Sequence, residues 1–174
     1  MIDSPDLLTF PAAMPMLETD RLILRELTPA DNAAIFALFS DPRVTESTDI
    51  GTFERIAQAD ELIAFFALRF AARGALRWGI TLKGDGTVIG TVGFPGMDDE
   101  TRRGEVGYDV ARAHWGRGIA TEATRAVVRF GFEGLNLNRI EATTNLGNMA
   151  SMRVLAKIGF TEEGILRDYR YWGG

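Results

Sequence analysis

The sequence predicts an α/β domain in which a mixed sheet is flanked by helices. Three features indicate this class: strand-like stretches of alternating apolar residues, helix-like stretches with apolar residues at steps of three and four, and the interleaving of the two. The chain has 174 residues, of which 46% are hydrophobic, enough for one sizeable core. No repeat, low-complexity tract or linker divides it, so we expect a flexible leader, 1–16, and a single domain, 17–174.

The first half of the chain predicts a strand, two helices and a hairpin. A strand is expected over 21–27, where leucines alternate with other residues. The stretch Thr28-Pro29-Ala30-Asp31 then begins a helix, because threonine can cap it, proline suits the first helical position and an acidic residue favours the positive helix end. A second helix is expected over 53–73, where apolar residues recur at helical spacing. Alternating stretches at 76–82 and 88–94, joined by a Gly-Asp-Gly turn, indicate a hairpin.

The second half of the chain predicts strands and helices in alternation. Strands are expected over 105–110, 140–144 and 160–171. Helices are expected over 118–133 and 148–159, and a glycine ends the second of them. The resulting order is β-α-α-β-β-β-α-β-α-β, which is typical of one α/β domain.

Composition argues against several functional classes. The formal net charge is −5 and no basic run occurs, so we expect no nucleic-acid partner. The chain has no Cys and one His, His114, which argues against disulfides, thiolate chemistry and a metal centre. His114 could be the base of a nucleophilic triad, but no Gly-x-Ser-x-Gly turn accompanies it. No apolar stretch reaches the roughly 18 residues of a membrane span, so we expect no membrane partner and a cytoplasmic location.

The most informative stretch is 108–122, where a strand turns through two glycines into a helix. Such a turn binds anions, because the first N–H groups of the helix lack partners and the helix dipole adds positive charge. Gly116 and Gly118 let a pyrophosphate approach closely, and Arg117 can supply a countercharge. A phosphate-binding P-loop would end in Gly-Lys-Ser/Thr, and a dinucleotide fingerprint would place Gly or Ala at Thr121, so neither pattern is met.

The stretch Trp115-Gly-Arg-Gly-Ile-Ala resembles the acetyl-CoA pyrophosphate loop of GNAT acetyltransferases, usually written Gln/Arg-x-x-Gly-x-Gly/Ala. Trp115 departs from the first position of that pattern, but a tryptophan is common there in the RimJ/RimL-like branch. Three further segments are similar to the same branch, in the family's order: Leu17–Arg25, Gly104–Tyr108 and Asn145–Phe160.

The resemblance implies how acetyl-CoA is held in a sheet whose central strands splay apart. The backbone around Val110 would pair with the pantetheine amides, and Asn148 would bind the pantetheine arm. Asn148 is equally suited to be a plain helix cap. The pyrophosphate would lie on the loop and the first helical turn, formed by Gly116, Arg117, Gly118, Ile119, Ala120 and Thr121.

The resemblance also implies candidates for proton transfer. An amine must be neutral to attack a thioester, yet lysine amines have pKa values of about 10.4 and α-amines of about 7.7 to 8.0. Glu105 is the candidate base, acting through water because it lies several residues before Val110; the alternative is a solvated strand carboxylate. Ser151 is the candidate acid for the leaving thiolate, or else a first-turn residue bonded to its own backbone. Tyr169 is a rival acid or a packed strand aromatic.

We therefore expect a GNAT N-acetyltransferase that moves acetyl directly from acetyl-CoA to a primary amine, either a protein N-terminal α-amine or a small amine, without a metal. Acceptor specificity should lie in the first two helices and the loop Asp41–Thr52, which carries no readable motif. The alternative is a non-catalytic acyl-CoA-binding sensor of the same fold.

The family resemblance implies one more strand after the end of this sequence. That final strand would insert between the strands at 140–144 and 160–171 and would leave a slot if it were missing. Unpaired strand edges recruit partners. We expect either further native residues, or a slot filled by a leader segment such as 6–10 or by a second molecule in a homodimer.

Overall fold

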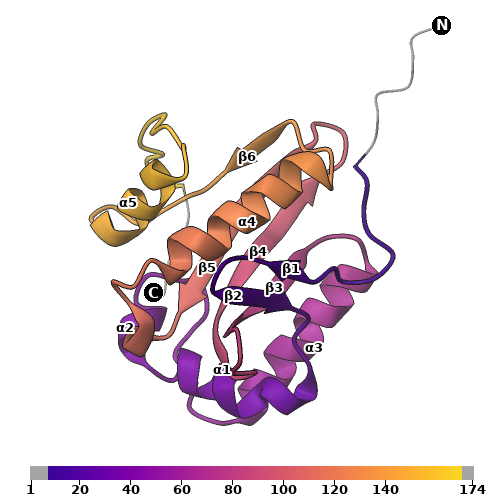
Figure 1. The fold of residues 1–174 in the computed structure, drawn as a ribbon. Helices are drawn as coiled ribbons and strands as arrows, with labels where there is room; N and C mark the ends of the chain where they lie inside the picture. Colours follow the sequence, from indigo (N-terminus) through magenta and orange to yellow (C-terminus); the bar gives the residue numbers. More distant parts are fainter. Residues whose placement is uncertain (1–7, 170–174) are drawn as a thin grey trace, which may run out of the picture.

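The computed structural model describes residues 8–169, whose elements follow one another in a sheet with helices on both faces (Figure 1). The strands are β1 (Leu17–Glu18), β2 (Leu22–Arg25), β3 (Leu76–Leu82), β4 (Val88–Asp98), β5 (Arg103–Val110) and β6 (Arg139–Glu141). The helices are α1 (Asn32–Phe39), α2 (Pro42–Thr45), α3 (Ala57–Ala71), α4 (Ile119–Glu133) and α5 (Met149–Lys157), with short 3₁₀ turns at Pro29–Asp31 and Arg112–His114.

The six strands form one sheet in the order β1-β2-β3-β4-β5-β6. Neighbouring strands are antiparallel from β1 to β5, whereas β5 and β6 are parallel. A parallel pair needs a long crossover, and α4 provides it. The predicted mixed α/β sheet flanked by helices is confirmed.

Two clusters of buried side chains lie between the sheet and its helices. The larger cluster joins the sheet to α4, and its centre is the fully buried Trp78. The Trp78 ring packs edge-on against Phe130 of α4 at 5.7 Å between ring centroids. The smaller cluster joins α1 and α3 around Phe39 and Ile63.

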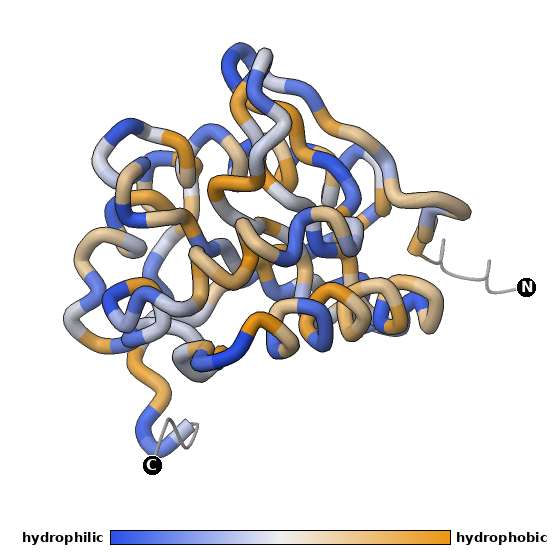
Figure 2. The backbone as a smooth tube through the Cα atoms, turned by 90° about the horizontal axis from the view of Figure 1, so that it is seen from below, coloured by the Kyte–Doolittle hydropathy of each residue, from blue (hydrophilic) through white to orange (hydrophobic). Residues whose placement is uncertain are grey.

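Figure 2 shows hydrophobic and hydrophilic residues interspersed along the chain. In α4, Ala123 and Val127 are buried whereas Arg125 and Arg129 are exposed, as a helix with one buried face requires.

The part of the predicted leader that the structure describes, residues 8–16, packs on the core. Leu8 is buried, and the Phe10 ring lies 5.2 Å from the ring of Phe70, between centroids. The Trp78 indole donates a hydrogen bond to the Pro15 carbonyl at 2.6 Å. Residues 8–10 form no strand beside β6, so the described part of the suggested leader filler does not occupy that edge.

The predicted strand over 160–171 is wrong for residues 160–169, which form no strand; 170 and 171 lie outside the described residues. Gly164 and Asp168 both have positive φ, 153° and 50°, which interrupts an extended backbone. The side chains from 161 to 169 are exposed, so alternation here marks no buried face. In the described part of the chain, the predicted slot therefore lacks one of its two flanking strands, and β6 is the last strand at that end of the sheet.

Within residues 8–169, no helix combines the length and apolar character needed to cross a membrane.

The pairing of β4 with β5 leaves no room for a side chain at Gly90, which lies opposite Val110. A Cβ at Gly90 would lie 2.4 Å from the Asp109 carbonyl oxygen and 3.1 Å from the Val110 Cα. We expect Gly90→Ala to lower the free energy of unfolding by about 1–3 kcal/mol, because β5 must move away. Gly96→Ala, on the same strand with no atom within 4 Å, should change it by less than about 0.5 kcal/mol. Equal denaturant midpoints for the two variants would contradict this packing.

Candidate functional site

The central feature of the site is the open edge of β5, residues 106–110. The parallel pairing with β6 covers only residues 103–105, and on that side of β5 no strand in the described part of the chain pairs with 106–110. On its other side, Val110 lies opposite Gly90, while the next residue, Ala111, donates its N–H to Ile89 of β4 at 2.8 Å. Hydrogen-bonded and non-bonded pairs alternate in antiparallel strands, so the Val110 N–H and C=O point away from β4. Figure 1 shows β6 and α5 diverging from β5 at this edge.

The loop that follows β5 leads directly into α4. Gly116 and Gly118 both adopt left-handed φ values, 72° and 77°, which favour glycine. A Cβ at Gly116 would meet no atom within 4 Å, so the backbone angle rather than space accounts for this glycine. The first hydrogen bond within α4 runs from Glu122 N–H to Gly118 O at 3.0 Å. The N–H groups of 119–121 therefore lack partners within the helix and, with the helix dipole, suit an anionic pyrophosphate.

Trp115 joins this loop to the open edge. Its indole N–H donates to the Val110 carbonyl oxygen at 2.6 Å, although almost half of the side chain is exposed. The bond holds the start of the loop against the end of β5. The sequence marks Trp115 as a residue common in the RimJ/RimL-like branch, but nothing in the spacing indicates its hydrogen-bond partner.

Asn148 lies at the N-terminus of α5, where its Oδ1 accepts the Ser151 N–H at 3.0 Å. The helix-cap interpretation of Asn148 is therefore confirmed. This bond uses the amide oxygen, so the amide nitrogen remains available to a ligand. The two interpretations of Asn148 left open by the sequence are compatible, because they use different atoms.

Tyr108 projects from β5 toward α5, and its hydroxyl forms a 2.8 Å hydrogen bond with Ser151 Oγ. Burial raises the pKa of Tyr108 above its ordinary value, and the bond with Ser151 offsets only part of this effect. The phenol is therefore protonated at neutral pH and can donate to Ser151. Sequence reasoning missed this pairing, because 43 residues separate the two side chains.

Glu105 lies on the opposite face of β5 from Tyr108, because successive side chains of a strand alternate. Its Oε1 accepts a hydrogen bond from Thr143 Oγ1, just after β6, at 2.6 Å. The structure thus separates Glu105 from Ser151, the candidate base from the candidate acid. Tyr169, the rival acid, is 56% exposed and lies in the irregular C-terminal segment.

Comparison with known proteins identifies the family. A family model described as the acetyltransferase (GNAT) domain matches residues 21–161, most of the chain. This chain belongs to the GNAT family. It is therefore an acetyltransferase, and its N-acetyltransferase relatives support the same class. All the candidate site residues except Tyr169 fall within the matched range.

Individual relatives agree with the assignment to GNAT. The uncharacterized N-acetyltransferase YoaA of Bacillus subtilis is 44% identical over 160 residues, which cover 92% of this chain and 90% of YoaA. Mycobacterium smegmatis RimJ, solved with a CoA-disulfide, has a TM-score of 0.80 at 24% identity, over 98% of this chain and 82% of that one. The microcin C7 self-immunity acetyltransferase MccE, solved with acetyl-CoA and AMP, has a TM-score of 0.81 at 21% identity, over 90% of this chain and 87% of that one. The predicted resemblance to the GNAT family is confirmed, with RimJ among the structural neighbours, and acetyl-CoA is the donor of the family.

A buried polar bridge holds β5 in the GNAT sheet on the Glu105 face. Arg77 of β3 forms an ion pair with Asp109 of β5, and both side chains are more than nine-tenths buried. Arg77 also donates to Thr91 Oγ1 of β4 at 2.8 Å and to the Gly107 carbonyl at 3.1 Å. Burial raises the pKa of Asp109, and the positive charge of Arg77 partly offsets this effect. The bridge links three strands just before Val110 and so holds the open edge in place.

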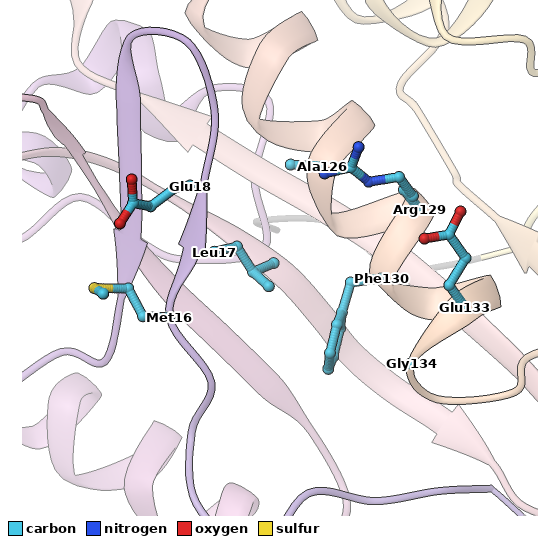
Figure 3. A pocket seen from close by; sticks show the side chains of 8 residues that line it. All are labelled: Met16, Leu17, Glu18, Ala126, Arg129, Phe130, Glu133 and Gly134. Carbon is cyan, nitrogen blue, oxygen red and sulfur yellow. The ribbon is translucent and has the colours of Figure 1, made fainter.

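A pocket elsewhere on the GNAT domain shares no residue with this site. It lies between β1 and the C-terminal half of α4, where the aromatic ring of Phe130 and the charged side chains of Glu18, Arg129 and Glu133 border it (Figure 3). None of the candidate catalytic or cofactor residues lines it. The candidate site is therefore the open edge of β5 with the N-termini of α4 and α5.

The cap at Asn148 predicts a difference between two substitutions. We expect Asn148→Ala to destabilise α5 by about 0.5–2 kcal/mol, because Ser151 N–H loses its acceptor. Asn148→Asp should preserve α5, since a carboxylate accepts the same bond and suits the positive helix end. Amide hydrogen exchange of residues 149–157 measures the effect. Equal protection in wild-type protein and Asn148→Ala would show that the cap contributes nothing.

Proposed function

We propose that this GNAT enzyme transfers the acetyl group of acetyl-CoA directly to a primary amine, without a covalent enzyme intermediate. One observation carries the proposal: the open edge of β5 ends beside a helix N-terminus that two left-handed glycines expose. The strand edge offers backbone partners to amides, and the helix end attracts phosphates. These two properties match the pantetheine arm and the pyrophosphate of acetyl-CoA.

The donor would be held mainly by backbone groups. The N–H groups of 119–121 and the flanking Gly116 and Gly118 would bind the pyrophosphate, with Arg117 as countercharge. The Val110 N–H can donate to the thioester carbonyl or to a pantetheine amide. Its carbonyl already accepts from Trp115 but retains a second lone pair. The Asn148 amide nitrogen would bind a pantetheine oxygen.

The transfer moves two protons. A neutral amine attacks the thioester carbonyl, the new C–N bond forms and the C–S bond breaks. The proton of the amine would pass through water to Glu105, whose carboxylate Thr143 orients. The thiolate would receive a proton from Ser151 Oγ, and Tyr108 can replace that proton through its hydrogen bond. Base and acid thus act from opposite faces of β5.

The acceptor would be a protein N-terminal α-amine or a small amine. An α-amine has a pKa closer to neutrality than a lysine side chain has, so a larger fraction of it is neutral at pH 7 and ready to attack. The ribosomal-protein-S5-alanine acetyltransferase of Vibrio fischeri, which has a similar fold, supports a protein acceptor. The segment Asp41–Thr52, which includes α2 and a 2.6 Å hydroxyl contact between Thr45 and Thr52, is the proposed specificity region.

A free-thiol assay with acetyl-CoA and a panel of amines tests the proposal. The panel should include peptides with different N-terminal residues, polyamines and free amino acids. We expect thiol release that depends on one class of amine, together with an acetylated product in mass spectrometry. Tight acetyl-CoA binding without release on any amine would favour a non-catalytic sensor.

The donor site predicts that Gly118→Asp abolishes acetyl-CoA binding, because it places a carboxylate where the pyrophosphate lies. Gly164→Asp is the matched control: Gly164 also has a positive φ, 153°, and a Cβ there would meet no atom within 4 Å, but its neighbour Glu163 pairs with Arg139 of β6, beyond the C-terminus of α4. Calorimetry on both folded variants measures the effect. Unchanged affinity in Gly118→Asp would place the donor elsewhere.

The proposed base predicts that Glu105→Gln lowers turnover by about 10²- to 10⁴-fold while acetyl-CoA affinity stays unchanged. Activity should partly recover at higher pH, where more of the amine is neutral. Glu141→Gln, opposite Glu105 in the β5–β6 register, is the control for loss of a charge and should retain most activity. A pH–rate profile of Glu105→Gln identical to that of the wild type would remove Glu105 from the mechanism.

A further inference from the structure

The turn between β1 and β2 docks on the first turn of α4. Arg21 in this turn donates from Nε to Oε2 of Glu122 at 2.7 Å, and its Nη2 lies 2.6 Å from the same oxygen. The Arg21 backbone N–H and the Thr19 hydroxyl donate to Oε1 of Glu122 at 2.9 and 2.6 Å. Four donor atoms from a segment 101 to 103 residues away thus converge on one carboxylate.

The same guanidinium contacts the loop between β5 and α4. Arg21 Nη1 donates to the Arg117 carbonyl oxygen at 3.0 Å. A Cβ at Gly118 would lie 3.4 Å from Arg21 Nη2, so the guanidinium lies against the left-handed cap of α4. Arg21 therefore bridges the Glu122 carboxylate and the backbone of the loop.

Glu122 occupies a position that conflicts with anion binding. A carboxylate in the first turn of a helix interacts well with the helix dipole, but a bound anion would need the same positive field and would be repelled. Partial burial raises the pKa of Glu122, and the hydrogen bonds from Thr19 and Arg21 more than offset this, so the pKa lies below its ordinary value. Glu122 is therefore ionised at neutral pH, and its charge must be compensated if a pyrophosphate is to bind nearby.

We propose that Arg21 and Thr19 mask the charge of Glu122, so that the N-terminus of α4 accepts the pyrophosphate of the donor. The inference rests on the proposed function, since it assumes that acetyl-CoA binds at this helix. Arg21 is a positioning residue here, because it acts through Glu122 and the Arg117 carbonyl and not on the reacting atoms. The hydrogen bonds from Arg21 and Thr19 leave the favourable interaction of Glu122 with the helix dipole in place while reducing the repulsion between Glu122 and a bound pyrophosphate.

The test is a double-mutant cycle on acetyl-CoA affinity, measured by calorimetry with the full chain. Arg21→Ala should raise the Kd of acetyl-CoA about tenfold or more, because it exposes the Glu122 charge. Glu122→Gln should bind as well as wild type, since the glutamine oxygen can accept the same bonds from Thr19 and the Arg21 backbone. The double variant should return to within about threefold of wild type, because it has no charge left to mask.

The cycle separates masking from direct contact with phosphate. A double variant as weak as Arg21→Ala would overturn masking, because loss of the guanidinium itself, either from the Arg117 carbonyl or from a phosphate, would then account for the defect. Unchanged affinity in Arg21→Ala would overturn the inference but leave the proposed function intact. Failure of the wild-type protein to bind acetyl-CoA would instead refute the proposed function.

Two readouts distinguish masking from a loss of structure. The affinity defect of Arg21→Ala should shrink as salt is raised, because ions screen the exposed charge. Turnover of S-acetylpantetheine, which lacks the pyrophosphate, should be equal in Arg21→Ala and wild type; an equal defect with both donors would contradict masking.

Lys83→Ala is the control for loss of a positive charge near the same turn. Lys83 pairs with Glu18 at 3.4 Å, and its loss should leave acetyl-CoA affinity within about twofold of wild type.

Discussion

The parallel pairing of β5 with β6 ends after three residues, and the rest of the site depends on this. A strand that loses its neighbour leaves N–H and C=O groups that need other partners. The Trp115 indole supplies one such partner to the Val110 carbonyl. The Val110 N–H also points away from β4, and a ligand with amide groups could continue the pattern of a further strand there. The same backbone geometry that would weaken an ordinary sheet would provide the proposed donor site.

The open edge of β5 can serve as a site only because the other side of β5 is fixed. Gly90 allows β4 to approach β5 so closely that a Cβ would clash with the backbone there, and the bridge of Arg77, Thr91 and Asp109 ties three strands together below the site. Removing one member of a buried ion pair is far more costly than keeping both, so this bridge also constrains the local structure strongly. Arg21 and Glu122 fix the neighbouring helix end in a similar way, at the surface. Rigid support on one side and unpaired backbone on the other together give a preorganised site.

Local signals accounted for most of the fold and for the loop at the centre of the site. Apolar spacing predicted the longer helices and the hairpin, although not the short α2. The glycine spacing predicted close approach of a pyrophosphate at Gly116 and Gly118, and the structure adds that both have left-handed φ angles. Contacts between distant segments could not be predicted, because the chain carries no local mark of them; the bond between Tyr108 and Ser151 is one such contact. The strand expected over 160–171 fails for its described residues because alternation alone does not create a buried face, and positive φ angles break the extended backbone.

Amide NMR of the labelled protein, titrated with acetyl-CoA, tests most directly whether the donor completes the open edge of β5. The account predicts that the amide resonances of Val110 and of 119–121 shift and that their hydrogens exchange more slowly, because these N–H groups gain acceptors. Amides of α3, on the other face of the sheet, should change little. Shifts confined to the pocket between β1 and α4, with Val110 and the start of α4 unchanged, would contradict the account.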